Sequence, residues 1–372
     1  MSSQSFPPGM GQPTVAGFVP PPAPSRPLPP RRIILEQRMG GLRKVVLSLA
    51  IAALVISLMF NFTLLGAYHS YMQTDTGIEE KFHSGSATAT DKIAIITLKG
   101  VIMEGDGFVK KQIDRISKDI DNGQDIRAVV VRVDSPGGTV TGSDYIYYHL
   151  KKLRTEKKIP IVVSMGSLAA SGGYYISMCA DGEDTIYAEP ATWTGSIGVI
   201  IPHYDISKFL ADHDIKDDSI ASGPLKQMLS PTRVVDETQR KQEQTVVKEL
   251  VDESFNRFKQ IVAEARPKLK EDPALMAKAT TGQIFSASQA RNLGLIDKIG
   301  YLEDAVERAG KLAGIDAKKA RVVKYHQPTG LREIFLGGSS ESATQLGMLL
   351  DMTAPRAFYL CTWLPGALGT AR

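Results

Sequence analysis

Cysteine and histidine are scarce in this chain of 372 residues, which contains two cysteines and six histidines. Two cysteines cannot form the disulfide framework of a small secreted domain, and their spacing does not match a metal site. Cys179 lies in an apolar, helix-like stretch and is predicted to be a core residue. Nothing in the sequence supports a disulfide bond between Cys179 and Cys361. We also expect the protein to use neither a metal ion nor a cofactor.

A strong charge of either sign is also missing, because the formal net charge at pH 7 is only +4. Basic residues do not form a run interleaved with aromatic side chains, which is the pattern of nucleic-acid-binding surfaces. We therefore expect no nucleic-acid partner. No internal duplication is visible in the sequence.

Charged residues are absent from Val45 to Tyr68, a stretch that includes the run LSLAIAALVISLMF. About 20 apolar residues suffice to cross a bilayer, and a secretory signal would have a shorter core. The nearby basic residues before the stretch are Arg31, Arg32, Arg38, Arg43 and Lys44, and the first one after it is Lys81. The positive-inside rule then predicts a single-pass anchor over 44–68 in the cell membrane, with the N-terminus cytoplasmic and the remainder extracytoplasmic.

Two further segments have compositions that predict no packed core of their own. Residues 1–43 are rich in proline and are expected to form a disordered cytoplasmic tail, with a ligand for a proline-binding module as the alternative. Residues 69–91 are rich in Ser, Thr and Gly and are expected to be a linker.

Apolar, β-branched runs alternate with helical patterns after the linker. Strands are predicted at Lys92–Met103, Ala128–Val133 and Ile159–Met165, with helices over Phe108–Asp121 and Ser143–Arg154 between them. This alternation is typical of βαβ units and predicts an α/β fold with a mostly parallel sheet. The carboxyl ends of such strands are where active sites lie.

Two glycine-bearing turns follow neighbouring predicted strands. The first reads SPGG and ends at Gly138, and the second reads AASGG and contains Ser171 and Gly172. Small residues on both sides of Ser171 leave its hydroxyl accessible to a chain, and the serine begins a predicted helix whose N-terminus favours a developing oxyanion. The two turns can therefore aim one hydroxyl and backbone N–H groups at a single point, as acyl transfer requires.

Four motifs in this order resemble those of the signal peptide peptidase A (SppA) family of membrane-bound Ser/Lys serine proteases. The motifs are SPGG, AASGGYY, TGSIGV and SGPLKQMLSP. The resemblance implies Ser171 as nucleophile, Lys226 as general base and Ser196 as the hydroxyl that hydrogen-bonds the lysine. It also implies an oxyanion hole built from Gly138 and Gly172.

The same resemblance implies a Clp protease/crotonase-like fold, a protease domain over 92–328 and a C-terminal extension over 329–372. Substrates would be cleaved signal peptides and other hydrophobic or unfolded chains, cut by a Ser–Lys dyad. Because the chain is not duplicated, it resembles the members that assemble as homo-oligomers. One departure is Gln283, where the family often has arginine.

A lysine can act as a base only when it is uncharged. The pKa of a free lysine is about 10.4, and burial lowers it. Leu225, Met228 and Leu229 surround Lys226 in the sequence and predict apolar cover for the amine. The competing interpretation is an ordinary solvated lysine.

Three alternatives remain at this point: one concerns the catalytic residues and two concern the function. His203 and Asp205 could complete a triad with Ser171, although two residues on one strand cannot readily form the linear arrangement that a triad needs. A crotonase-like acyl-CoA enzyme would use similar paired N–H groups. A non-catalytic membrane scaffold on the same fold would use none of these residues.

The later part of the chain adds helices and one strand. A helix is predicted from Ser230-Pro231 to Pro267, another over Leu302–Leu312, and a strand over Arg321–Tyr325. The apolar segment Ala357–Leu364 is too short to span a membrane and is expected to pack on the body of the protein.

Overall fold

The computed structural model describes residues 40–72, 77–180, 182–327 and 357–360. The chain divides into two compact units, one up to Gln73 and one from Thr74 onward. The predicted tail over 1–43 lies almost entirely outside the described residues, as does Cys361.

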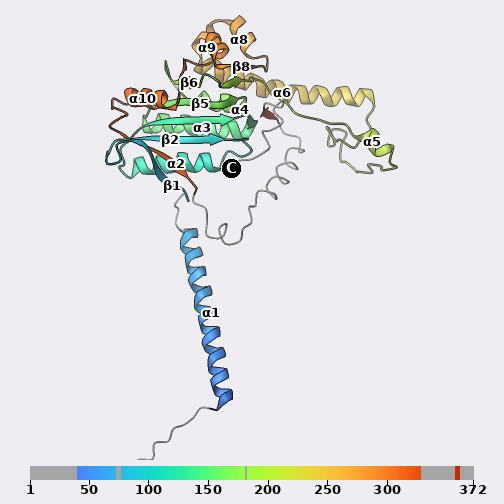
Figure 1. Cartoon of the computed structure of the whole chain (residues 1–372). Helices are drawn as coiled ribbons and strands as arrows, with labels where there is room; N and C mark the ends of the chain where they lie inside the picture. Colours follow the sequence, from blue (N-terminus) through green and yellow to red (C-terminus); the bar gives the residue numbers. More distant parts are fainter. Residues whose placement is uncertain (1–39, 73–76, 181, 328–356, 361–372) are drawn as a thin grey trace, which may run out of the picture. The chain divides into compact units, whose positions relative to one another are not determined.

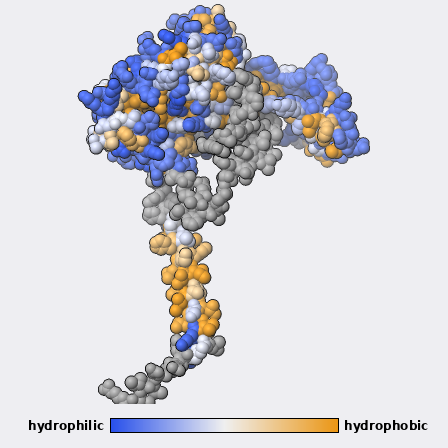
Figure 2. All heavy atoms as spheres, in the orientation of Figure 1, coloured by the Kyte–Doolittle hydropathy of each residue, from blue (hydrophilic) through white to orange (hydrophobic). Residues whose placement is uncertain are grey.

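The first unit consists of helix α1, Gly41–Met72. Its portion Arg43–Gly66 is long and apolar enough to cross a membrane, and none of this portion is buried inside the protein. Figure 2 shows apolar residues along most of this helix. The predicted helix over the uncharged stretch is therefore confirmed.

The second unit is built on a sheet whose strand order is β1-β10-β2-β3-β5-β6-β9 (Figure 1). Only β1 pairs antiparallel along this order, and the other neighbours are parallel. Strand β7 continues the sheet at the carboxyl end of β5, and β8 pairs with β7. The bounds are Glu79–Gly85 (β1), Lys92–Lys99 (β2), Ile126–Ser135 (β3), Ile161–Ala170 (β5), Ile186–Ala188 (β6), Trp193–Gly195 (β7), Ile284–Ser286 (β8), Lys298–Ile299 (β9) and Arg321–His326 (β10). The predicted α/β fold with a mostly parallel sheet is confirmed.

Helices cover both faces of this sheet because alternate strand residues point to opposite sides. Ala94 and Ile96 of β2 belong to the large core cluster, whereas Ile93 and Ile95 pack in a second cluster with α10. The large cluster also contains residues of α2, α3, α4 and α6. The helix bounds are Phe108–Asp121 (α2), Val140–Lys157 (α3), Gly172–Ser177 (α4), Ser207–Ala211 (α5), Glu237–Ala265 (α6), Pro267–Glu271 (α7), Pro273–Ala279 (α8), Ala287–Leu293 (α9) and Leu302–Leu312 (α10).

The structure differs from the sequence analysis in two elements. Strand β1 lies inside the stretch expected to be a linker, because Glu79–Gly85 pairs with the edge of the sheet along β10. Helix α6 begins at Glu237 and not at Ser230-Pro231, since the carboxylate of Asp236 accepts the N–H of Gln239 (2.7 Å) and caps the helix. Ser230 instead pairs with the Thr232 hydroxyl in the preceding loop.

A second, two-stranded sheet lies beside the carboxyl end of β3. It pairs β4, Gly137–Thr139, with β11, Phe358–Leu360, in antiparallel register. The expected packing of the apolar C-terminal segment on the body is confirmed for residues 357–360, and residues 361–364 lie outside the described part of the chain.

Candidate active site

Ser171 stands between the end of β5 and the first residue of α4. Its φ of 52° and ψ of −112° are unusual for a residue with a side chain, and strained backbone of this kind clusters at functional sites. Its N–H donates to the Gly195 carbonyl (2.8 Å), and its own carbonyl accepts the N–H of Tyr175 (2.8 Å). The residue is only 1% exposed, yet its hydroxyl has no hydrogen-bond partner among the described residues. A buried hydroxyl without a partner costs free energy, and such a group in a folded protein is a mark of a functional position.

Ser196 lies next to Ser171 because β7 pairs with the end of β5. Gly195 stands opposite Ala170 in that pairing, so the residues that follow them are neighbours. Ser196 also has a positive φ (51°) and is largely buried. Its N–H donates to the backbone carbonyl of Gln283 (2.7 Å), a contact that does not depend on the side chain at that position.

Gly138 and Gly172 lie close to each other, and neither position has room for a side chain. A methyl group on Gly172 would lie 3.2 Å from the nitrogen of Gly138 and well inside 3.0 Å of the Ser143 hydroxyl. A methyl group on Gly138 would overlap the backbone of Ile102. The two glycines expected to form the oxyanion hole are thus brought together beside Ser171.

The C-terminal strand lies against the same pair of glycines. Tyr359 stands opposite Gly138 in the β4–β11 pairing. A methyl group on Gly137 would overlap the Tyr359 carbonyl oxygen and lie 2.7 Å from the Gly172 nitrogen. The Tyr359 carbonyl therefore faces the candidate oxyanion hole. The sequence analysis did not foresee this, since the segment carried only an apolar signal.

Lys226 is not brought to Ser171 within this chain. It lies exposed in a turn near the start of α6, where the Gln239 side chain donates to the Pro224 carbonyl (3.3 Å). Phe258, near the other end of α6, meets Tyr175 edge to face, with ring centroids 5.0 Å apart. The 19 residues from Gln239 to Phe258 span about 28 Å of helix.

Figure 1 shows that α4 and α5 lie at opposite ends of the long helix α6. The apolar cover predicted for Lys226 is therefore absent in the single chain, because the loop that carries it stands away from the sheet.

The alternative triad does not form. His203 is exposed, and the Asp205 carboxylate accepts the backbone N–H (3.0 Å) and hydroxyl (2.6 Å) of Ser207 as well as Arg240 (3.2 Å). These hydrogen bonds from Ser207, more than the one from Arg240, lower the pKa of Asp205. Asp205 therefore binds Ser207, the first residue of α5, and connects it to Arg240 of α6.

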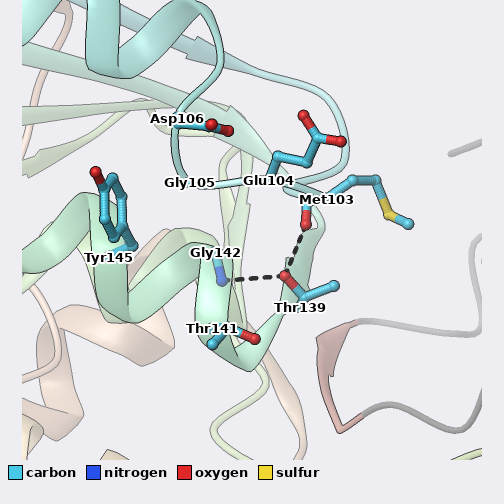
Figure 3. A pocket seen from close by; sticks show the side chains of 8 residues that line it. All are labelled: Met103, Glu104, Gly105, Asp106, Thr139, Thr141, Gly142 and Tyr145. Atoms are coloured by element: carbon cyan, nitrogen blue, oxygen red, sulfur yellow. Dashed lines mark hydrogen bonds between the residues drawn. The ribbon is translucent and has the colours of Figure 1, made fainter.

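A pocket of about 390 Å³ lies near the candidate oxyanion hole (Figure 3). It is bounded by the loop of Met103 to Asp106 and by the start of α3, with the Thr139 hydroxyl bonded to the Met103 carbonyl between them. Gly138 of β4 forms a parallel β-bridge with Ile102 on one edge and an antiparallel pair with Tyr359 on the other edge. The pocket is therefore on the side of β4 opposite to the C-terminal strand.

The structure also shows where the Cys179 thiol and the possible metal ligands lie. Cys179 is buried, and burial raises the pKa of its thiol to about 12, so it is a core residue as predicted. Within the described ranges, no cluster of three or more His, Cys, Asp or Glu residues could hold a metal ion.

Comparison with known proteins gives consistent matches. The model of the family described as Peptidase family S49 matches residues 153–316. The chain is 36% identical over 253 residues to a Synechocystis sp. protein named as a protease, a match covering 68% of this chain and 86% of that protein. It is 32% identical to an Enterococcus faecium protein named as a signal peptide peptidase SppA, covering 74% of this chain and 79% of that one. It is also 29% identical to the chloroplastic serine protease SPPA of Arabidopsis thaliana, covering 74% of this chain and 41% of that one.

Proposed function

Because the chain belongs to peptidase family S49, with its Clp protease/crotonase-like fold, it is a serine protease, and we propose that it is a membrane-anchored endopeptidase with Ser171 as nucleophile. One observation carries this assignment: the Ser171 hydroxyl is buried and has no partner in the described residues, beside the backbone of Gly138 and Gly172. The names of the relatives favour proteolysis over acyl-CoA chemistry and over a non-catalytic scaffold.

The reaction follows from these groups. Ser171 Oγ gives its proton to the neutral amine of Lys226 and attacks the scissile carbonyl. The N–H groups of Gly138 and Gly172 hold the oxyanion, and Ser196 orients the amine. Protonated Lys226 then gives this proton to the leaving amine. In the second step neutral Lys226 takes a proton from water, which attacks the acyl group, and the proton passes to Ser171 Oγ as the acid is released. No metal or cofactor takes part in this sequence.

We place Lys226 of an adjoining copy at each Ser171. In one chain, Lys226 lies at the start of α6, whereas Ser171 lies near its far end. The loop around α5 also exposes apolar side chains, visible as orange among blue in Figure 2, and such a surface is typical of a contact with another subunit. These residues are Tyr204, Ile206, Phe209, Ile215, Ile220 and Val234.

A mixing experiment tests this arrangement. Ser171→Ala and Lys226→Ala chains are each expected to be inactive on a hydrophobic peptide. Co-assembled in equal amounts, they are expected to recover about a quarter of the wild-type activity, because a quarter of the sites then combine an intact serine with an intact lysine.

The control is Lys241→Ala, which removes an exposed lysine of α6 and is expected to remain active. An active Lys226→Ala chain would refute the lysine base. Folded but inactive mixtures would refute its donation from a neighbour.

We also propose that α1 anchors the enzyme in the cell membrane with the protease domain outside the cytoplasm. The helix is uncharged from Val45 to Tyr68 and follows a basic segment. Substrates near a membrane would include signal peptide remnants and other hydrophobic chains, in line with the name of the Enterococcus relative.

Membrane fractionation tests the anchor. A variant with Ile51→Arg and Leu58→Arg is expected to leave the membrane fraction, because each central arginine opposes insertion by about 3 kcal/mol. Ile220→Arg changes a fully exposed apolar residue outside the helix and is expected to stay with the membrane. A double variant that remains membrane-bound would refute the anchor.

A further inference from the structure

Strand β5 is irregular just before the nucleophile turn. In its pairing with β3, Met165 stands opposite Val133, but Ala169 stands opposite Ser135. One residue of β3 therefore faces three residues of β5, residues 166–168, which we call the β5 bulge. Bulges re-aim the residues that follow them and are over-represented next to active sites.

The β5 bulge sets how far the strand carries Ser171 along the sheet. In a regular pairing Ser167, and not Ala169, would lie opposite Ser135. A strand advances by about 3.3 Å per residue, so the two extra residues draw the end of β5 back by about 6.6 Å. Ser171 now follows Ala169 by two residues, as Gly137 follows Ser135, and the nucleophile lies level with the turn that carries the candidate oxyanion hole.

Asp134 holds the β5 bulge on the edge that faces β3. Its Oδ1 accepts the hydroxyl of Ser167 (2.5 Å) and the backbone N–H of Leu168 (3.1 Å). A methyl group added at Gly166 would lie 3.3 Å from Asp134 Cγ, so the bulge packs directly on this side chain. A carboxylate thus takes the place of the backbone partners that a regular strand pair supplies.

Thr192 holds the β5 bulge on its other edge. There β5 pairs with β6 as far as Met165 and with β7 from Leu168 onward, so the pairing is interrupted between them. The fully buried Thr192 donates its hydroxyl to the Gly166 carbonyl (2.5 Å) inside this interruption. A buried carbonyl needs such a partner, and this hydroxyl supplies it.

We infer that Asp134 and Thr192 are positioning residues of the protease, which fix the β5 bulge and through it the place of the Ser171 hydroxyl relative to the oxyanion hole. The inference rests on the proposed function of Ser171. Because both side chains act on the β5 bulge and not on a bound peptide, their loss is expected to slow the chemical step and to leave KM nearly unchanged.

The test uses the full chain in detergent and a hydrophobic peptide. Asp134→Ala is expected to lower kcat by about thirtyfold, since Thr192 still holds part of the bulge and a full 1 Å displacement would cost about a hundredfold. Asp134→Asn keeps an oxygen that accepts both hydrogen bonds and is expected to stay within about threefold of wild type.

Thr192→Val tests the second edge without changing the shape of the side chain, and kcat is expected to fall by about tenfold. Combined with Asp134→Ala, its effect is expected to be less than the product of the two, because both residues hold one bulge. Labelling of Ser171 by a fluorophosphonate gives a readout without a peptide, and its rate is expected to fall in parallel with kcat.

Asp91→Ala is the matched control. It removes a carboxylate that accepts a hydrogen bond from Arg127 (2.7 Å) at the opposite end of β3, and kcat is expected to stay unchanged. The unfolding temperature of every variant is measured in parallel, so that a general loss of stability is distinguished from a misplaced nucleophile.

The outcomes separate this inference from the proposed function. A folded Asp134→Ala chain with wild-type kcat, or an Asp134→Asn chain as slow as Asp134→Ala, would overturn the role of Asp134. A raised KM with unchanged kcat would place it in substrate binding instead. If Asp134→Ala does not fold, a folded Thr192→Val chain with unchanged kcat and labelling would overturn the role of the β5 bulge. Activity that survives Ser171→Ala would refute the proposed function itself.

Discussion

Replacing Gly172 by alanine tests the geometry of the candidate oxyanion hole most directly. The added methyl group would lie 3.2 Å from both the Gly138 nitrogen and the Gly137 Cα, and far too close to the Ser143 hydroxyl. Ordinary contact requires the Ser143 hydroxyl, in the first turn of α3, to move by about 1 Å, whereas the Gly138 nitrogen needs to move by only a few tenths of an ångström. Because β4 leads directly into α3, the movement of α3 is passed on to β4, and a displacement of about 1 Å at reacting groups costs about a hundredfold in rate. We expect kcat/KM to fall by about that factor, because β4 and its N–H group are pushed away from Ser171.

Ser143→Ala provides a partial rescue that a general loss of stability would not show. The Ser143 hydroxyl donates to the Thr139 carbonyl within α3 (2.9 Å), so its removal alone is expected to cost about 1 kcal/mol of stability and little activity. The double variant Gly172→Ala/Ser143→Ala relieves the closest overlap and is expected to regain about tenfold of the lost kcat/KM.

Peptide hydrolysis by the four chains, with their unfolding curves, measures this cycle. A Gly172→Ala chain within twofold of wild type would refute the close approach of the two turns. Equal losses in the single and double variants would show that the Ser143 contact is not the cause.

Two further predictions concern stability. Asp297→Asn is expected to lower the free energy of unfolding by about 3 kcal/mol, because the largely buried guanidinium of Arg266, whose nitrogen lies 2.7 Å from the Asp297 carboxylate, loses its charge partner. Unfolding in urea measures this loss, and an unchanged urea concentration at the midpoint of unfolding would contradict it. Burial raises the pKa of Cys179 from 9.0 to about 12, so the folded state keeps a proton that the unfolded chain releases. The stabilisation is present below about pH 9 and is lost as the pH rises from 9 to 12, whereas a Cys179→Ala chain should lack this component of the pH dependence.

The sheet and the nucleophile turn were predictable because local patterns determine them. The β-branched run Ala128–Val133 is largely buried on both faces, as expected for a central parallel strand, and the structure places it inside β3. The sequence AASGG likewise predicted a small-flanked serine before a helix, and Ser171 stands at that point. Such features depend on residues within one turn or strand of each other.

Features that depend on competition between distant partners were not predictable. Residues 79–85 are polar and read as linker, but they become β1 because the edge of β10 offers unpaired backbone groups. Ser230-Pro231 combines a capping hydroxyl with a proline, which is typical of a helix start, yet α6 begins after Asp236, whose side chain caps it. In both cases contacts in the folded protein, and not the local sequence, determine whether residues 79–85 form a strand and where α6 begins.

The parallel α/β fold, the apolar N-terminal helix and the serine–glycine chemistry could be predicted, because each follows from the order and type of neighbouring residues. Two other features depend on contacts between distant residues: Lys226 lies far from Ser171 in its own chain, and Tyr359 lies beside the oxyanion glycines. The distance between Lys226 and Ser171 is determined by the length and direction of α6. The position of Tyr359 is determined by an open strand edge that residues 357–360 complete.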